Sequence, residues 1–157
     1  MIKNMFFRIN KVIDSKLVYN FSNFVQRAYK LNREVVYIIF DSPGGFLSDS
    51  GKIIDIMNAS KLKFVGIAYK RVNSAALPIF LSSDVRFGYG ETSALIHRVE
   101  QIDLKTSKFE VQRAEKEVFE ILSKKLEIPI ENIYEMADKN TVIDLNHSLG
   151  KKLFLNK

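Results

Sequence analysis

The segment Val35–Phe40 constrains the fold more than any other stretch of the chain. It reads Val-Val-Tyr-Ile-Ile-Phe, a run of β-branched and aromatic residues with no charged residue among them. A strand exposed on one face alternates apolar and polar side chains, whereas an uninterrupted run of this kind is typical of a strand buried on both faces. Such strands occur mainly in parallel sheets that helices cover. The run therefore predicts an α/β fold.

Predicted strands and helices alternate along the rest of the chain. Further strands are expected in apolar runs at Ile2–Ile9, Phe64–Tyr69, Val85–Tyr89, Ala94–His97 and Thr141–Ile143. Helices are expected where apolar residues recur at helical spacing, from Asp14 or Ser15 to about Leu31 and over Leu47–Ala59, Ala75–Leu81, Ser107–Leu126, Pro129–Asp138 and Asn146–Leu153. This alternation favours a mainly parallel β-sheet with flanking helices. Because residues 1–157 contain no linker and no repeat, a single domain is predicted.

The composition narrows the possible sites and partners. The 157 residues include no cysteine, which excludes disulfides, thiolate metal sites and a cysteine nucleophile. The net charge is +6, but the basic residues are scattered, so no nucleic-acid partner is expected. The apolar runs are too short to span a membrane, and the first residues lack the pattern of a signal peptide. A cytoplasmic protein with no metal and no other cofactor is expected.

Two turns that follow predicted strands carry the residues of chemical interest. The sequence DSPGG, which includes Gly44 and Gly45, ends the strand at Phe40, and Ser74 separates the next strand from a short apolar helix. Because right-handed crossovers bring the carboxyl ends of parallel strands together, both turns are expected at one edge of the sheet. Adjacent glycines let backbone N–H groups approach a ligand closely, as an oxyanion hole requires. Taken alone, the glycines are equally a simple turn, and Ser74 is either a nucleophile or an ordinary helix cap.

The chain has only two histidines, and any serine–histidine chemistry must use one of them. His97 follows the apolar run Ser-Ala-Leu-Ile at a predicted strand end, whereas His147 lies in a polar, helical context near the C-terminus. The position at a strand end makes His97 the better candidate for the base. A histidine in this position can also be a structural residue that is hydrogen-bonded to its neighbours.

Three segments together resemble one known family. The sequences FDSPGGFLSDSGKIIDIM, NSAALPIFLSSD and SALIHRVE, in this order, resemble the proteolytic subunit of the Clp protease (ClpP), a serine peptidase with a crotonase-like fold. The resemblance covers the chain from about Phe6 onwards. It implies a serine-type endopeptidase that cleaves peptides or unfolded proteins. The combination of SPGG, the serine turn and the histidine strand end is much more specific than any one of them.

The resemblance implies a role for each matching residue. Ser74 would be the nucleophile and His97 its general base. The N–H groups of Gly45 and Ala75 would form the oxyanion hole. The mechanism implied is acyl transfer, in which His97 takes the Ser74 proton, an acyl-enzyme forms and water releases it.

The resemblance also implies a substrate-binding strip at Gly44 and Phe46, and a third catalytic residue. Aligning the segment Val-Ile-Asp-Leu with the family pattern puts Asn140 where the family has an aspartate, with Asp138 and Asp144 as alternative carboxylates. An asparagine accepts the imidazole N–H but carries no charge to stabilise the imidazolium. In trypsin-like proteases this exchange lowers kcat by about 10⁴, so attenuated activity is expected.

Other departures from the family pattern concern partners. Family members form heptameric rings, so the resemblance implies a homo-oligomeric ring around a peptide substrate. Two such rings join through a handle that follows the histidine, but here that segment is shorter and HRVEQIDLKTSKF contains no glycine. The sequence therefore does not decide whether two rings join. The chain also begins close to its first predicted strand, so the sequence does not decide whether a Clp ATPase docks to this protein.

Three alternative functions remain compatible with the residues. The first is a catalytically weak or inactive ClpP-like subunit, which Asn140 and the unusual Ala75-Ala76 after the serine support. The second is an acyl-CoA enzyme of the crotonase superfamily, although such an enzyme needs no Ser74 and His97 at this spacing. The third is a serine–lysine dyad, but Lys70 lies on the incoming strand in a poor position to reach Ser74.

Overall fold

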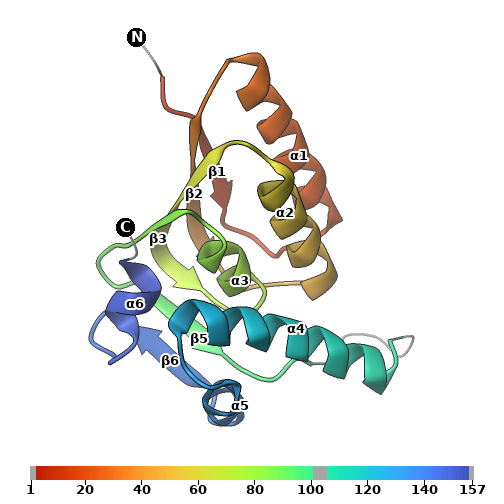
Figure 1. The fold of residues 1–157 in the computed structure, drawn as a ribbon, viewed down its shortest axis with the longest axis vertical. Coiled ribbons are helices and arrows are strands. Elements are labelled where there is room, and N and C mark those ends of the chain that lie inside the picture. The colour runs from red at the N-terminus through yellow and green to blue at the C-terminus, as the bar shows by residue number, and fades with distance from the viewer. Residues whose placement is uncertain (1–2, 101–105, 156–157) are drawn as a thin grey trace.

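A computed structural model of the chain describes residues 3–100 and 106–155. Six strands and six helices lie within these residues (Figure 1). The strands are β1 (Phe6–Ile9), β2 (Val35–Ser42), β3 (Lys63–Val72), β4 (Val85–Gly88), β5 (Ser93–Ile96) and β6 (Thr141–Asp144). The helices are α1 (Ser15–Lys30), α2 (Leu47–Ala59), α3 (Ala76–Leu81), α4 (Lys108–Leu126), α5 (Ile130–Asp138) and α6 (Gly150–Phe154).

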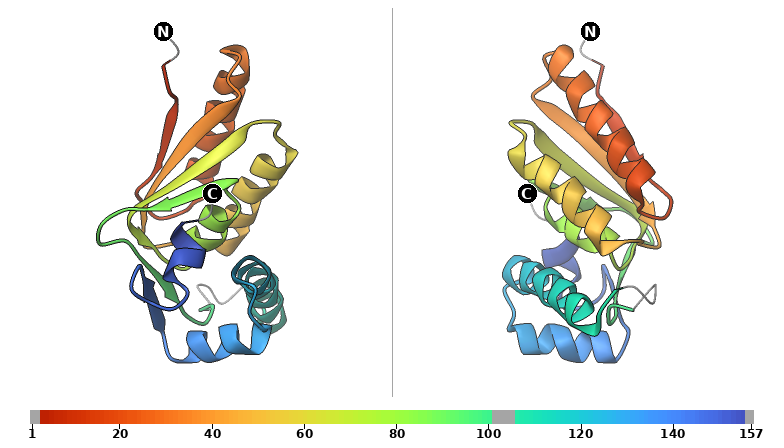
Figure 2. Two further views of the ribbon diagram at one scale, coloured as in Figure 1. Left: turned by 60° about the vertical axis from the view of Figure 1, so that its left-hand side comes forward. Right: turned by 90° about the vertical axis from the view of Figure 1, so that its right-hand side faces the viewer.

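The strands form one sheet in the order β1-β2-β3-β5-β6, with β4 also paired to β3. Every pairing is parallel except that of β5 with β6, which is antiparallel. This arrangement confirms the predicted α/β class with a mainly parallel sheet. Helices α1 and α2 lie side by side over one face of the sheet (Figure 2), while α4 packs against α3 and α5.

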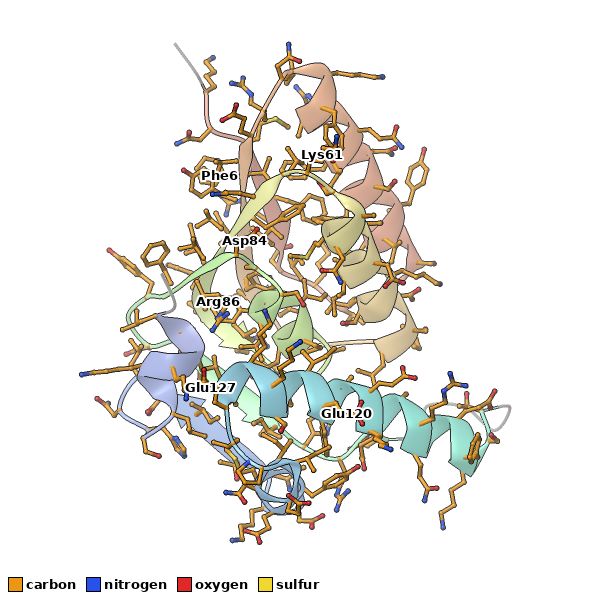
Figure 3. The ribbon with its side chains drawn as sticks, viewed as in Figure 1. Phe6, Lys61, Asp84, Arg86, Glu120 and Glu127 are labelled. Atoms are coloured by element: carbon orange, nitrogen blue, oxygen red, sulfur yellow. The ribbon has the colours of Figure 1, made fainter. Side chains whose placement is uncertain are left out.

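The expectation that Val35–Phe40 is buried on both faces is wrong for this single chain. Val36, Ile38 and Phe40 point towards the helices and are completely buried, but Val35 is exposed and Tyr37 is only half-buried. No described helix packs on the second face over β1, β2 and β3. Phe6 lies on that open face (Figure 3), with its ring stacked on Tyr37 at 5.1 Å between centroids.

Most predicted helix boundaries are confirmed, and side-chain caps are found at the beginning of two helices. Asp14 caps α1 by accepting a hydrogen bond from the Leu17 N–H at 2.8 Å. Ser107 and Glu110 form a reciprocal capping box at the start of α4. Carboxylate and hydroxyl oxygens satisfy the first N–H groups of a helix, which is why these residues mark its beginning.

Three element boundaries differ from the sequence prediction by three residues or more. Strand β1 begins at Phe6 rather than Ile2, and β3 continues to Val72, so the serine turn follows it directly. The last helix covers only Gly150–Phe154 instead of beginning at Asn146. The reason is that the Asp144 carboxylate accepts hydrogen bonds from the backbone N–H groups of Asn146 and His147, both at 2.9 Å, and closes a turn there.

The core lies between the sheet and the helices, and it encloses α3. All six residues of α3 are buried. Arg86 is also buried beside this helix (Figure 3), and its guanidinium donates to the carbonyl oxygens of Leu81 and Leu153. Among the helices of the described residues, none has the length and apolar character that crossing a membrane requires.

Candidate active site

The turn that follows β2 is held against the chain ahead of α1 by two backbone hydrogen bonds. The Ile13 N–H donates to the Gly44 carbonyl, and the Phe46 N–H donates to the Ile13 carbonyl, both at 2.9 Å. A Cβ at Gly45 would lie 2.3 Å from the Ile13 carbonyl oxygen, so only glycine allows the two segments to approach this closely. The two hydrogen bonds to Ile13 involve the Gly44 carbonyl and the Phe46 N–H. The Gly45 N–H, which shares a planar trans peptide group with the Gly44 carbonyl, therefore points away from Ile13.

Ser74 lies directly beside this turn, as the parallel topology predicts. A Cβ built on Gly44, whose φ is +105°, would lie 2.8 Å from the Ser74 Cβ. Ser74 itself has φ of 51°, in the left-handed region that is uncommon for serine. Its N–H donates to the Leu95 carbonyl at 3.2 Å, which ties the serine turn to β5.

The structure does not support the interpretation of Ser74 as a helix cap. The residue at the cap position of α3 is Ala75, and no side chain caps this helix. Ser74 is thus held in a strained backbone conformation, and its hydroxyl caps no helix in the described residues. Strain of this kind is frequent at nucleophiles on sharp strand-to-helix turns.

Two backbone N–H groups beside Ser74 have no acceptor among the described residues: those of Gly45 and Ala75. The Ala75 nitrogen lies 3.2 Å from the position of a Cβ on Gly44, so both N–H groups belong to one small region. The Ala75 carbonyl on the other side accepts from the buried Ser50 hydroxyl at 2.7 Å. Paired N–H groups without a partner can stabilise an oxyanion.

Ser74 and His97 line one cavity of about 610 Å³. Gly45 and Phe46 contribute to its wall from the turn after β2, and Val111 and Ala114 contribute from α4. Gly44 is buried behind Ser74 and does not belong to the lining. The cavity therefore brings together the serine, the histidine and one of the N–H groups of the candidate oxyanion hole.

The histidine is oriented by the backbone in the structure. The His97 Nδ1 lies 2.6 Å from the Arg98 carbonyl oxygen, which can only accept, so Nδ1 carries the proton. In this tautomer Nε2 is the atom that is free to accept a proton. No hydrogen bond joins His97 to Ser74 or to Asn140, all three of which lie in the described part of the chain.

The antiparallel pairing of β5 with β6 places Asn140 next to His97. Ile96 and Thr141 form the last pair of this ladder, and His97 and Asn140 are the next residue on each strand. Asn140 is exposed and has φ of 49°. Of the candidates for the third residue, it is the one that the register brings to the histidine.

The two alternative carboxylates are used elsewhere. Asp138 binds Arg98 at 2.6 Å between Oδ1 and Nε, and this hydrogen bond lowers the pKa of the Asp138 carboxyl. Asp144 pairs with Ser93 at the far end of the β5–β6 ladder and closes the turn that follows β6. Neither carboxylate contacts the imidazole of His97 in the structure.

The other candidates from the sequence lie outside the cavity lining. The Nδ1 of His147 accepts from the Leu149 N–H at 3.1 Å within its own turn. Lys70 is exposed, and its ammonium lies 5.6 Å from the ring centroid of Tyr69. Within the described residues, no cluster of three metal-ligating side chains is found.

A family model described as Clp protease matches residues 9–150. The chain belongs to the Clp protease family. A comparison with curated protein sequences finds no match.

Solved ClpP structures share the fold of this Clp protease family member. ClpP1 from Listeria monocytogenes superposes with a TM-score of 0.83 at 19% identity, covering 96% of this chain and 88% of that chain. An asparagine-to-aspartate variant of the same protein gives 0.84 at 18% identity with the same coverage. The ClpP catalytic domain from Plasmodium falciparum gives 0.77 at 22% identity, covering 88% of this chain and 76% of that one. At these identities the likeness shows the fold alone.

Sequence reasoning missed the side chains that support the site. Ser50 holds the Ala75 carbonyl, and Asn73 accepts from the Leu95 N–H at 3.1 Å through its side-chain oxygen. Glu115 on α4 binds both Arg98 and the Val99 N–H. Asn73 and Arg98 lie in the segments NSAALPIFLSSD and SALIHRVE that resemble the family, and that was the one available signal. No sequence pattern pointed to Ser50 or Glu115.

Proposed function

We propose that this protein is a serine endopeptidase that cleaves peptides or unfolded proteins through an acyl-enzyme on Ser74. One observation carries the proposal: a serine in a left-handed turn lines the same cavity as the histidine, beside two N–H groups without an acceptor in the described residues. These features are not expected together around a serine that has only a structural role. Membership of the Clp protease family supports the same reaction class.

In the proposed mechanism, His97 acts through Nε2, which is unprotonated in the tautomer described above. Nε2 takes the proton as the Ser74 Oγ attacks the scissile carbonyl, and later gives it to the leaving amine. The N–H groups of Gly45 and Ala75 stabilise the negative oxygen of the tetrahedral intermediate. Ser74 and His97 lie in one cavity but are not yet hydrogen-bonded, which is common in unliganded hydrolases.

The substrate binds as an extended peptide beside Gly44–Phe46 in this proposal. The bonds to Ile13 occupy one side of this segment and leave the Gly45 N–H directed to the other. Phe46 is 42% exposed and lines the cavity, so it can contact a substrate side chain next to the scissile bond. An exposed strand edge that adds a peptide strand is a recurrent mode of substrate recognition.

Covalent labelling by a fluorophosphonate, read by intact mass, tests the nucleophile. Labelling is expected in the wild type and in Ser48→Ala, which removes another serine of the same cavity, but not in Ser74→Ala. We expect Asn140→Asp to react faster, because a carboxylate beside His97 stabilises the imidazolium. Labelling that survives in Ser74→Ala would overturn the proposal.

A catalytically weak subunit is the second candidate function. The uncharged Asn140 beside His97 favours it, because an amide does not stabilise the imidazolium by charge. This function predicts no labelling of the wild type but clear labelling of Asn140→Asp. The same experiment therefore separates the two candidates.

We further propose that copies of this chain assemble into a ring, and the resemblance to ClpP implies heptamers. The open face of the sheet supports assembly, because the register aligns Phe6 with Tyr37 and Ile67 with Phe87 on the side that carries no helix. Phe6 is 51% exposed and Phe87 is 40% exposed. Sedimentation that gives a monomer at working concentration would contradict the ring. A Clp ATPase partner and a cytoplasmic location stay predictions.

A further inference from the structure

The hydrogen bond that orients His97 ends on a peptide group, not on a side chain. His97 Nδ1–H donates to the carbonyl of Arg98 at 2.6 Å. That carbonyl belongs to the same peptide group as the N–H of Val99. Because the peptide group is planar and trans, its C=O and N–H point in opposite directions. Whatever holds the Val99 N–H therefore also aims the Arg98 carbonyl at the imidazole.

Glu115 is the residue that holds the Val99 N–H. Its Oε2 accepts this N–H at 2.9 Å, while its Oε1 accepts from Arg98 Nη1 at 2.8 Å. The two oxygens of one carboxylate thus fix Arg98 and Val99, the two residues that share the peptide group. The Glu115 side chain is only 12% exposed, so solvent screens these charge-assisted bonds little.

The carboxylate is itself kept in place by α4 and α5. Arg98 makes its second ion pair with Asp138 at 2.6 Å, and its guanidinium lies 4.7 Å from the ring centroid of Tyr134 on α5. The Tyr134 ring packs edge-on against Phe119 of α4, with 4.9 Å between centroids. Glu115 and the peptide group that it holds are therefore parts of a packed framework.

We propose that Glu115 is the positioning residue for His97, acting through the Arg98–Val99 peptide group. It polarises that peptide group and fixes its direction, so that the Arg98 carbonyl keeps the proton on Nδ1 and leaves Nε2 as the base. The Glu115 carboxylate thereby helps to orient the imidazole of His97, which is part of the role that a carboxylate at position 140 would have. The inference rests on the proposed function, because positioning matters only if His97 is the base.

The tautomer of His97 tests the positioning directly. Nitrogen-15 spectra of histidine-labelled protein at pH 8.5 distinguish Nδ1–H from Nε2–H, and the chain has only two histidines to assign. His147 is an internal reference, because its Nδ1 accepts from the Leu149 N–H and its proton must be on Nε2. We expect Nδ1–H for His97 in the wild type.

Two substitutions of Glu115 separate orientation from charge. In Glu115→Ala the His97 signal is expected to move towards Nε2–H, the form that dominates in a free histidine side chain. In Glu115→Gln it is expected to stay with Nδ1–H, because the amide oxygen still accepts the Val99 N–H. Asn140→Ala is expected to leave the tautomer unchanged. An unaltered Nδ1–H signal in Glu115→Ala would overturn the inference.

Labelling kinetics give the second readout. We expect Glu115→Ala to react with the fluorophosphonate about tenfold more slowly than the wild type and Glu115→Gln about threefold more slowly, the range that the net contribution of one ordinary hydrogen bond supplies. Glu117→Gln is the matched control on the same helix, because its exposed partner is Arg113, and it is expected to react within about twofold of the wild type.

The two readouts distinguish failure of the inference from failure of the proposed function. A wild type that is never labelled at Ser74 contradicts the peptidase, and the tautomer still decides whether Glu115 positions His97. A labelled wild type with equal rates in Glu115→Ala contradicts only the inference. Circular dichroism and urea unfolding of both Glu115 variants establish that a slower reaction is not a loss of fold.

Discussion

The two halves of the candidate site are built in different ways. The serine half, Ser42–Gly45 with Asn73–Ala75, is held mainly by backbone hydrogen bonds, such as Asn73 N–H to the Ser42 carbonyl at 3.1 Å and Ser74 N–H to the Leu95 carbonyl. The histidine half, His97–Val99, is held by side chains that reach it from α4 and α5. The geometry of the serine half is thus set by the backbone conformation, whereas the geometry of the histidine half is set by a few side chains.

This difference has a consequence for evolution and for engineering. Backbone geometry tolerates few changes, because glycine is required where Gly45 meets Ile13. Side-chain supports can be exchanged one at a time, each with a modest effect. We therefore expect fluorophosphonate labelling to be lost when the backbone of the serine half is altered. It should fall only gradually as the side chains that support the histidine half are removed one at a time.

Gly44→Ala is expected to have the largest effect. The new Cβ would lie 2.8 Å from the Ser74 Cβ and 2.9 Å from the Asn73 carbonyl oxygen, at a φ of +105°. Strain and overpacking of this kind cost about 2 kcal/mol or more in the free energy of unfolding. Urea unfolding measures the loss, and fluorophosphonate labelling is expected to disappear even in the protein that remains folded.

Gly51→Ala is the control for this substitution. Gly51 lies within α2, and a Cβ there would meet no atom within 4 Å. Alanine in a helix is expected to raise the free energy of unfolding by about 0.5–1 kcal/mol and to leave labelling unchanged. If Gly44→Ala is as stable and as reactive as Gly51→Ala, the serine half does not depend on its backbone geometry as described.

Asn73→Ala is expected to have an intermediate effect, because Asn73 is the one residue of the serine half whose side chain bonds to β5. The substitution removes the acceptor of the Leu95 N–H. An unsatisfied, partly buried N–H costs about 1–2 kcal/mol, and the labelling rate should fall several-fold because Ser74 is also tied to Leu95.

Asn73→Asp tests whether the acceptor itself matters. The aspartate keeps an oxygen for the Leu95 N–H, so it should restore most of the stability and the labelling rate that alanine loses. Asn58→Ala, at an exposed asparagine on α2, should leave the labelling rate unchanged and raise the free energy of unfolding by no more than about 0.7 kcal/mol, through helix propensity. Equal losses in Asn73→Asp and Asn73→Ala would show that the hydrogen bond to Leu95 is not the reason for the effect.

Sequence reasoning succeeded where topology decides the outcome. Gly44 and Ser74 were expected at one edge because both follow strands of a parallel sheet, and the structure places them in contact. Asn140 was expected near His97 from the family pattern alone, and the β5–β6 ladder provides the physical reason. Each of these positions is fixed by strand pairing, which a sequence pattern can indicate.

The supports of His97 could not be predicted, for a physical reason. Glu115 lies on a helix whose rotation and distance from β5 depend on how α4 packs, and no periodicity in the sequence specifies that packing. The open face of the sheet was missed for a related reason. The apolar run at Val35–Phe40 indicates that both faces avoid water, but it does not say whether helices or another copy of the chain cover the second face.

The smallest expected effect concerns Asp138, which shares Arg98 with Glu115 but is itself exposed. The hydrogen bond from Arg98 lowers the pKa of Asp138, so the ion pair stabilises the folded state above the ordinary aspartate pKa and is lost as the pH falls through the lowered value. Wild type should therefore be slightly more stable than Asp138→Asn at pH 7, and the difference should vanish in strong acid. Urea midpoints of the two proteins across this pH range measure it.

The tautomer of His97 should not change in Asp138→Asn, because the carboxylate that holds the Val99 N–H is that of Glu115. Exposed ion pairs are screened by salt, whereas the Glu115 bonds are largely buried, so high salt should reproduce the effect of Asp138→Asn without altering the histidine. If Asp138→Asn moves the His97 signal as far as Glu115→Ala does, then the whole Arg98 cluster positions the histidine. In that case the histidine half would respond as a single unit, and its difference from the serine half would disappear.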